Sequence, residues 1–123
     1  MGEGVSSEGS SPKPEVTAED FGALDLRVGR VVKVEAFPEA RRPAWKLAVD
    51  FGPDLGVRWT SAQVTRYSAE ELLGRQVVGA VNLGSRRIAG FESQFLLLGA
   101  IGPDGVVHLL APDADVPPGS PIA

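Results

Sequence analysis

Alternation of apolar and polar residues is the feature of this sequence that most restricts its fold. In residues 44–51, every second residue from Trp45 to Phe51 is large and apolar. Such a two-residue period predicts a strand with one face packed against a core. The turn-forming run Gly-Pro-Asp-Leu-Gly at 52–56 then leads into a second apolar segment at 57–61. The two segments therefore predict a β-hairpin.

Further strand patterns lie on both sides of this hairpin. Residues 26–36 place Val28, Val32 and Val34 on one face of a predicted strand, with Val31 on the other. Three later segments are rich in aliphatic residues and are also predicted as strands: 76–83, 94–101 and 106–110.

Two short helices have recognisable ends. Thr17 and Asp20 have the spacing of a capping box, which predicts a helix from there to about Leu24. Ser68 and Glu71 repeat that spacing, and the Gly that follows at position 74 predicts a left-handed stop. The second helix falls between the third and fourth predicted strands.

Three strands, a short helix and two more strands is the element order of the five-stranded OB-fold barrel. We therefore predict an all-β domain over 16–123, with a short helix between strands three and four and additions at both ends. Residues 1–15 are rich in Gly, Ser and Glu and lack an apolar period, so we predict that they are disordered.

The net charge of −4 is unevenly distributed. Residues 1–20 carry five acids and one base, and residues 102–123 carry three acids and no Lys or Arg. Residues 21–101 carry 11 bases and 8 acids. The centre of the chain is therefore mildly basic and can attract anions, although the protein as a whole is acidic.

Catalytic and metal chemistry have little support in the residues. The chain has no cysteine, and its single histidine, His108, lies within a predicted strand. No glycine-rich phosphate loop precedes a helix, and the carboxylates are scattered. We expect a binding module without cofactor or bound metal, and not an enzyme. No secretory signal or apolar membrane span is visible, so we expect a cytoplasmic protein without membrane insertion.

Two arginine pairs mark the predicted binding groove. Arg41-Arg42 lies between the first two predicted strands, and Arg86-Arg87 lies in the loop 84–93 between the last two barrel strands. In an OB fold these two loops flank the ligand groove. Guanidinium groups bind carboxylates and phosphates and stack on flat groups, so the pairs predict basic rims.

Aromatic residues lie near the same loops. Phe37 and Phe91 are in loops and are predicted to offer exposed apolar contacts, whereas Trp45 begins the inward stripe of its strand and is predicted as core. Such a groove can hold single-stranded RNA by base stacking, or an extended peptide by insertion of its side chains.

Several ordered motifs resemble one family. They are Asp25-Leu26-Arg27-Val28-Gly29, Phe37-Pro38-Glu39-Ala40-Arg41, Lys46-Leu47, Asp50-Phe51-Gly52, Ser61-Ala62-Gln63, Val81-Asn82 and Arg86-Arg87-Ile88-Ala89-Gly90-Phe91-Glu92-Ser93. Together, over about 21–122, they resemble the CsaA family of export-related bacterial chaperones. That family is part of the wider group of tRNA-binding OB-fold modules found at the ends of some aminoacyl-tRNA synthetases.

The resemblance implies a homodimer whose termini help to form the interface. It also implies that the groove binds unfolded precursor proteins and assists their delivery to the Sec export machinery, including its ATPase. The tRNA-binding relatives usually have Gly-Met where this chain has Gln94-Phe95, which favours the peptide-binding branch. Two alternatives stay open, a tRNA-binding module acting in trans and a structural dimer whose groove holds nothing specific. The predicted peptide- or RNA-binding residues are Phe37, Arg41, Arg42, Lys46, Arg58, Asn82, Arg86, Arg87, Phe91, Ser93 and Gln94.

Overall fold

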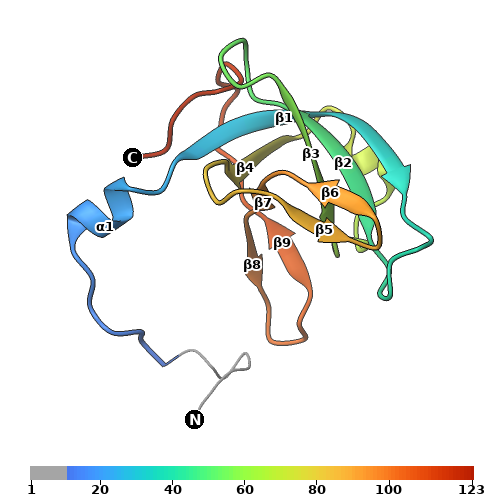
Figure 1. Cartoon of the computed structure of the whole chain (residues 1–123), viewed down its shortest axis with the longest axis horizontal. Coiled ribbons are helices and arrows are strands. Elements are labelled where there is room, and N and C mark those ends of the chain that lie inside the picture. The colour runs from blue at the N-terminus through green and yellow to red at the C-terminus, as the bar shows by residue number, and fades with distance from the viewer. Residues whose placement is uncertain (1–10) are drawn as a thin grey trace.

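An antiparallel five-stranded sheet forms the centre of the molecule, seen in a computed structural model that describes residues 11–123 (Figure 1). Its spatial order is β3-β2-β1-β4-β7. The strands are β1 (Leu26–Ala36), β2 (Trp45–Asp50), β3 (Val57–Ala62), β4 (Gln76–Ala80) and β7 (Leu96–Leu97). The predicted bounds of the first strand coincide with those of β1, and the predicted β2–β3 hairpin is confirmed.

The long strand β1 pairs with both of its neighbours in turn. Its residues Arg30–Ala36 pair with β2, and Leu26–Arg30 pair with β4. The register with β2 shifts between Val31 and Lys33, which is a β-bulge. Because Val32 is the extra residue of this bulge, Val31 and Val34 pair with the buried residues Val49 and Leu47, and both pack in the core. The predicted alternation, with Val28, Val32 and Val34 on one face and Val31 on the other, is therefore wrong beyond Val31, because Val34 shares the core side with Val31.

Hydrogen bonds between β3 and the segment leading into β7 bring the two edges of the sheet together. The Gln94 amide donates to Trp59 O (2.7 Å), and Gln94 Oε1 accepts from the Trp59 amide (2.8 Å). The hydroxyl of Thr60 donates to Phe95 O (2.9 Å). The five strands thus form a nearly closed barrel, and the predicted all-β OB fold is confirmed.

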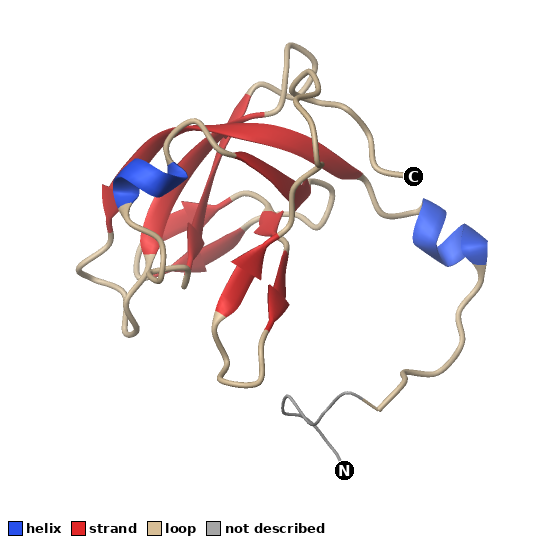
Figure 2. Cartoon of the chain, turned by 180° about the vertical axis from the view of Figure 1, so that it is seen from behind, coloured by secondary structure: helices blue, strands red, loops and turns tan. Residues whose placement is uncertain are grey.

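Both predicted helices are present and are short. They are α1 (Ala18–Gly22) and α2 (Ala69–Leu72). Each has a complete capping box, with Thr17 and Ser68 as the N-cap residues, and Gly74 has the predicted left-handed conformation (φ 85°). The helix α2 lies between β3 and β4, as predicted, and buries Leu72. The helix α1 buries no residue and stands apart from the barrel (Figures 1 and 2).

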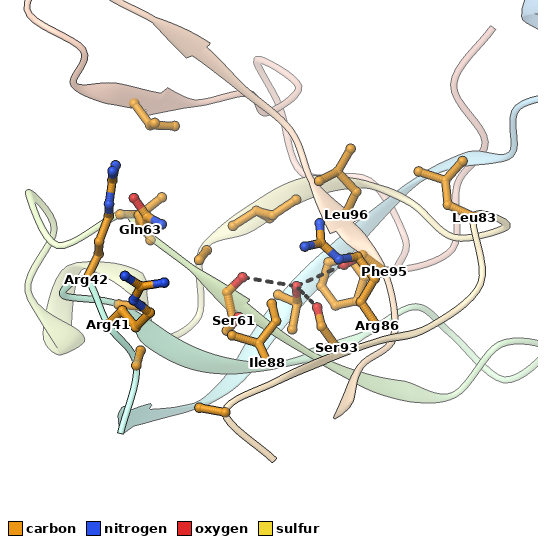
Figure 3. A pocket seen from close by; sticks show the side chains of 18 of the residues that line it. Arg41, Arg42, Ser61, Gln63, Leu83, Arg86, Ile88, Ser93, Phe95 and Leu96 are labelled. Atoms are coloured by element: carbon orange, nitrogen blue, oxygen red, sulfur yellow. Dashed lines mark hydrogen bonds between the residues drawn. The ribbon is translucent and has the colours of Figure 1, made fainter. Parts of the chain in front are cut away.

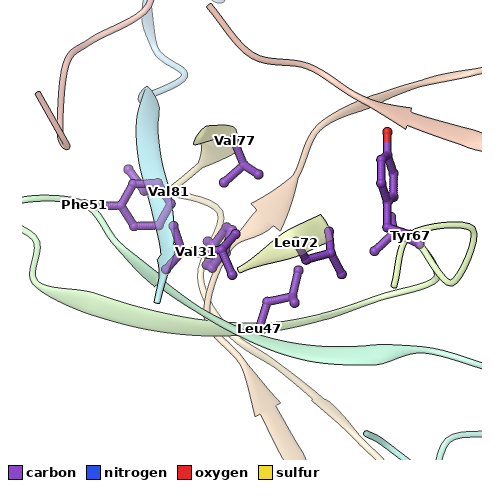
Figure 4. Packing of buried hydrophobic residues seen from close by; sticks show 10 residues of the cluster. Val31, Leu47, Phe51, Tyr67, Leu72, Val77 and Val81 are labelled. Atoms are coloured by element: carbon purple, nitrogen blue, oxygen red, sulfur yellow. The ribbon is translucent and has the colours of Figure 1, made fainter. Parts of the chain in front are cut away.

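The core fills the inside of the barrel (Figure 4). Leu47 and Val49 of β2 are fully buried, together with Phe51 just after that strand. The Phe51 ring meets Phe95 edge to face, with centroids 4.9 Å apart. A Cβ added at Gly79 would lie 2.8 Å from the Phe95 ring, so this close ring packing needs a glycine.

The predicted loop 84–93 is instead a β-hairpin, β5 (Arg86–Ile88) and β6 (Phe91–Ser93). Its two turn residues, Ala89 and Gly90, have φ of 49° and 81°. Two positive φ values are the requirement of the tightest hairpin turn, and alanine rarely adopts one. Because alanine stands at the first turn position, the sequence contains no signal for a two-residue hairpin turn here. The hairpin does join the paired strands β4 and β7, as the OB order requires.

The predicted strand 94–101 is also divided. Only Leu96–Leu97 (β7) pairs in the barrel sheet. The following β8 (Gly99–Ile101) leaves it and pairs with β9 (Val107–Leu109), forming a separate hairpin. A continuous apolar run does not show where such a strand changes partner.

The C-terminal segment returns to the start of β1 (Figure 2). Gly119 N donates to Val28 O (2.7 Å), Val28 N donates to Ser120 O (2.9 Å) and Ile122 N donates to Leu26 O (2.9 Å). These bonds cover the part of β1 that β2 leaves unpaired.

In the described residues 11–123, no helix is long and apolar enough to cross a membrane. The disorder predicted for 1–15 falls mostly on residues outside the described part of the chain, so it stays a prediction.

Candidate functional site

A groove of about 1020 Å³ opens between the β1–β2 loop, β3 and the β5–β6 hairpin (Figure 3). Its floor is aliphatic and is lined by Leu83, Ile88, Leu96, Leu97, Val107 and Leu109. The one aromatic residue among the described residues that line it, Phe95, is only 4% exposed. The groove therefore offers aliphatic contacts and no accessible ring face.

Arginines from two separate segments line this groove. Arg41 and Arg42, from the β1–β2 loop, lie near Gln63 at one end, and Arg86 lies farther along it, with Ile88 between them (Figure 3). No Asp or Glu occurs among the described residues that line the groove. The predicted meeting of the two arginine-bearing segments is thus found for three of the four arginines.

The side chains of these three arginines are unlike those of the other six in the chain. Each of the six has a partner within the protein: Arg27 with Asp25, Arg30 with Gly74 O, Arg58 with Val81 O, Arg66 and Arg75 with the Tyr67 ring, and Arg87 with Gly90 O. Within residues 11–123, no hydrogen bond, ion pair or ring contact engages the guanidinium of Arg41, Arg42 or Arg86. These three groups are available to a ligand. Arg87, by contrast, lies outside the groove and closes its own hairpin turn.

Phe91 belongs to an aromatic cluster beside the groove. Its ring meets Phe37 and Trp59 edge to face, with centroid separations of 5.4 Å and 6.3 Å. The ammonium group of Lys46 lies 4.8 Å from the Phe37 centroid and 5.1 Å from the Phe91 centroid. Phe37 is 4% exposed, so the prediction that it offers an exposed contact is wrong. It packs under Phe91, and this aromatic cluster fastens the β5–β6 hairpin to the barrel.

A second cavity of about 330 Å³ lies against the same cluster. It is lined by Glu35, Lys46, Trp59, Phe91, Glu92 and Gln94. Phe91 is half-buried there. Among the described residues that line this cavity, Lys46 is the one cation, and Glu35 and Glu92 are the two acids. The predicted residues Lys46, Phe91 and Gln94 thus lie together, but in a different cavity from the three arginines.

Two predicted site residues make hydrogen bonds within the protein. Asn82 Oδ1 accepts from the Asp25 amide (2.9 Å), and Asn82 Nδ2 donates to Ala23 O (2.8 Å). Arg58 donates to Val81 O (2.8 Å). Asn82 therefore fixes the connection from α1 to β1, and Arg58 links β3 to the end of β4. Their role in ligand binding stays a prediction.

Ser93 and Gln94 take part in closing the barrel. Ser93 is buried, lines the groove and lies 3.0 Å, oxygen to oxygen, from the Thr60 hydroxyl (Figure 3). Gln94 uses its amide and its side chain to pair with Trp59. The sequence analysis predicted both residues as ligand contacts and did not predict that they join β3 to the segment before β7.

The aliphatic floor is the part of the groove that sequence reasoning missed. Leu83 and Leu96 are both more than half exposed, although each lies in a segment predicted as a strand. The apolar run around Leu96 is equally typical of a buried strand, so no local signal marked it as surface. The only available signal was its position directly after the arginine-bearing loop.

The described residues contain no group of three or more His, Cys, Asp or Glu that could hold a metal ion. Among the described residues, the groove thus combines an aliphatic lining with three arginines that have no partner within residues 11–123.

Comparisons with known proteins agree with this geometry. The family described as "Putative tRNA binding domain" matches residues 26–121, which include the whole barrel and the β8–β9 hairpin. The chain belongs to this tRNA-binding domain family. Among solved members of similar structure are CsaA chaperones. The one from Bacillus anthracis str. Ames is 46% identical, with a TM-score of 0.84, and the match covers 89% of this chain and all of that one. The one from Picrophilus torridus is 43% identical, with the same TM-score and coverage.

Larger members of the tRNA-binding domain family match as well. The methionine--tRNA ligase of Methanosarcina acetivorans is 35% identical over 109 residues, which is 89% of this chain and 15% of the ligase. That of Methanococcus maripaludis is 41% identical over 102 residues, again 15% of the ligase. The chain thus spans only 15% of the length of these curated relatives, and its likeness to them lies in the tRNA-binding domain.

Proposed function

We propose that this protein is a chaperone that binds extended segments of unfolded proteins in the groove between the β1–β2 loop and the β5–β6 hairpin. One observation carries the proposal: among the described residues, the groove is lined by aliphatic side chains and three arginines and by no exposed ring. An extended chain can insert alternate side chains into such a floor. The likeness to the CsaA chaperones over their whole length supports the same conclusion.

Dimerisation, cytoplasmic location and a link to export are further parts of this proposal. Phe21 and Leu24 at α1 and Ile101 on the β8–β9 hairpin are large apolar residues that the single chain leaves exposed. A second copy of the chain would cover such surface in a two-fold dimer. In this view the protein is a binding module without catalysis or cofactor, and it passes unfolded precursors to the Sec export ATPase.

Binding of tRNA is the second candidate function. Three unpartnered arginines in a groove without acids also fit phosphate groups. Family membership and the ligase relatives favour this alternative. The floor offers the unpaired nucleotides of a tRNA no exposed ring on which to stack, so binding would depend on its phosphates alone.

A matched pair of leucine variants separates the candidates. Leu96 lies in the groove and is 52% exposed, whereas Leu73 lies at the end of α2, outside the groove, and is 57% exposed. We expect Leu96→Ser to weaken binding of an unfolded, permanently denatured polypeptide by about 1–2 kcal/mol, and Leu73→Ser to leave it unchanged.

The titration uses fluorescence anisotropy with the denatured polypeptide and with tRNA, each at low and high salt. Peptide binding through apolar contacts should change little with salt, whereas phosphate binding should fall steeply as salt rises. Salt-steep tRNA binding with no measurable polypeptide binding would reject the chaperone proposal in favour of tRNA.

A further inference from the structure

We propose that the groove selects polypeptide segments in which acidic residues flank a short apolar run, and that it discriminates against segments with basic flanks. This inference rests on the proposed peptide-binding function and names its substrate class. The arrangement of charge in the groove carries it.

The charge in the groove differs from that of the molecule around it. The protein has a net charge of −4, yet Arg41, Arg42 and Arg86 line the groove and no acid does, among the residues described. The other six arginines are engaged within the protein, whereas these three have no partner among residues 11–123. Three like charges around one concave surface make the local potential positive and attract an anionic ligand.

The order of the charges along the groove predicts the order of residues in the client. The Arg41-Arg42 pair lies at one end, Ile88 lies between this pair and Arg86, and Leu96 and Leu83 lie beside and beyond Arg86 (Figure 3). A carboxylate can accept two parallel hydrogen bonds from a guanidinium group, so acidic side chains suit both arginine positions. Apolar side chains between those acids would contact the floor. A client lysine near either arginine position would instead meet like charge, which lowers affinity most at low salt.

The same order favours a peptide over a nucleic acid. A nucleic acid carries a phosphate at every nucleotide, so some phosphates would lie over the aliphatic middle of the groove without a partner. Its bases would find no accessible ring, since Phe95 is buried and Phe91 lines the other cavity. A polypeptide can place charge at the arginine positions alone.

One consequence concerns how a precursor is recognised. Secretory signal peptides begin with a basic segment. Three free arginines would repel that segment, so this groove would bind precursors through acidic and apolar stretches elsewhere in the chain.

The test uses three dye-labelled peptides of equal length with the same leucine-rich centre and with Glu, Gln or Lys at both flanks. Fluorescence anisotropy with the full-length protein should rank their affinities in the order Glu, Gln, Lys. We expect about a threefold to tenfold difference between Glu and Gln flanks, decreasing as salt rises. A fourth peptide, with all its Glu residues at one flank, should bind more weakly than the peptide with Glu at both.

Two double variants assign the preference to the groove. Arg42→Gln/Arg86→Gln removes one cation from each arginine position and should bring the affinity for the Glu-flanked peptide down to that for the Gln-flanked one. Lys33→Gln/Arg66→Gln makes the same change in net charge at exposed residues outside the groove, and should keep the preference.

Three outcomes would overturn the inference. Equal binding of all three peptides would reject charge selection but leave the peptide-binding function intact. Loss of the preference in both double variants would assign it to net charge and not to the groove. Tighter binding of a uridine homopolymer, with displacement of the Glu-flanked peptide, would assign the groove to nucleic acid. Absence of binding to every peptide would instead contradict the proposed function itself.

Discussion

Gln94 pairs with Trp59 through two hydrogen bonds, one from its backbone amide to Trp59 O and one from the Trp59 amide to its own Oε1, at 2.7 Å and 2.8 Å. The side-chain carbonyl thus occupies the place that a neighbouring strand's carbonyl would have in a regular sheet. This glutamine, predicted as a ligand contact, continues the barrel where β3 and β7 are too short to pair fully.

Replacing Gln94 by alanine should therefore destabilise the fold. The change leaves the Trp59 amide of β3 without its acceptor, which costs about 1–3 kcal/mol for a part-buried donor. Urea unfolding followed by tryptophan fluorescence measures this cost. Gln63→Ala is the control, because Gln63 is an exposed glutamine of the same groove region. Unchanged stability together with lost peptide affinity would restore Gln94 as a ligand contact.

Replacing Phe91 by alanine should weaken peptide binding on the order of 1–2 kcal/mol. The reason is positional, since Phe91 fastens the hairpin that carries Arg86 and Ile88 to Phe37 and Trp59. Titration of the variant with unfolded peptide measures the loss. Phe21→Ala, a ring lost from the exposed helix α1, serves as the control. If Phe91→Ala left the affinity unchanged, the hairpin would be held without this ring.

Glu71 should contribute to the acid sensitivity of the protein. The hydrogen bond from the Ser68 amide lowers the pKa of Glu71 below its usual value of 4.5. A carboxylate with a lowered pKa stabilises the fold above its unfolded pKa and loses that contribution as pH falls through the folded pKa. Glu71→Ala should therefore be less stable than the natural sequence at neutral pH, and the difference should shrink below about pH 4.5. Thermal melts across pH 3–7 measure it; a difference independent of pH would contradict the assignment.

Gly79→Ala should destabilise the core by about 1–3 kcal/mol through overpacking. The added methyl would lie 2.8 Å from Phe95 and 3.0 Å from Phe51, between two rings already in contact. Gly22→Ala, in α1, has nothing within 4 Å of the new methyl and should be neutral or slightly stabilising. Equal melting temperatures for the two variants would show that the rings can move apart without cost.

Local sequence patterns correctly predicted the helices and the hairpin whose ends carry capping or turn-forming residues. The capping boxes at Thr17 and Ser68 and the 52–56 turn marked the two helices and the β2–β3 hairpin correctly, because those signals act over a few residues. The bulge after Val31 and the division of strand 94–101 depend on pairing partners far along the chain. Neither is encoded in a local period.

The candidate site was predicted only in part, because the sequence shows which residues lie in each loop but not which way their side chains point. Arg41, Arg42 and Arg86 line the groove, as the loop positions of an OB fold indicated. Phe37 was expected to be exposed but is buried, because the chain after β1 turns its ring under Phe91. A loop position in the sequence gives no information on which side of the loop faces the barrel.

The C-terminal segment also determines what the edge of β1 can no longer do. An unpaired strand edge offers free amides and carbonyls to any other extended chain, and this is a common start of aggregation. In 117–122 the prolines at 117, 118 and 121 have no N–H, and the amides of Gly119, Ser120 and Ile122 are all bonded within the protein. The segment therefore covers β1 and presents no amide donor of its own. Truncating it would expose a strand edge that can pair with further chains. Residues 117–122 therefore protect β1 from intermolecular strand pairing.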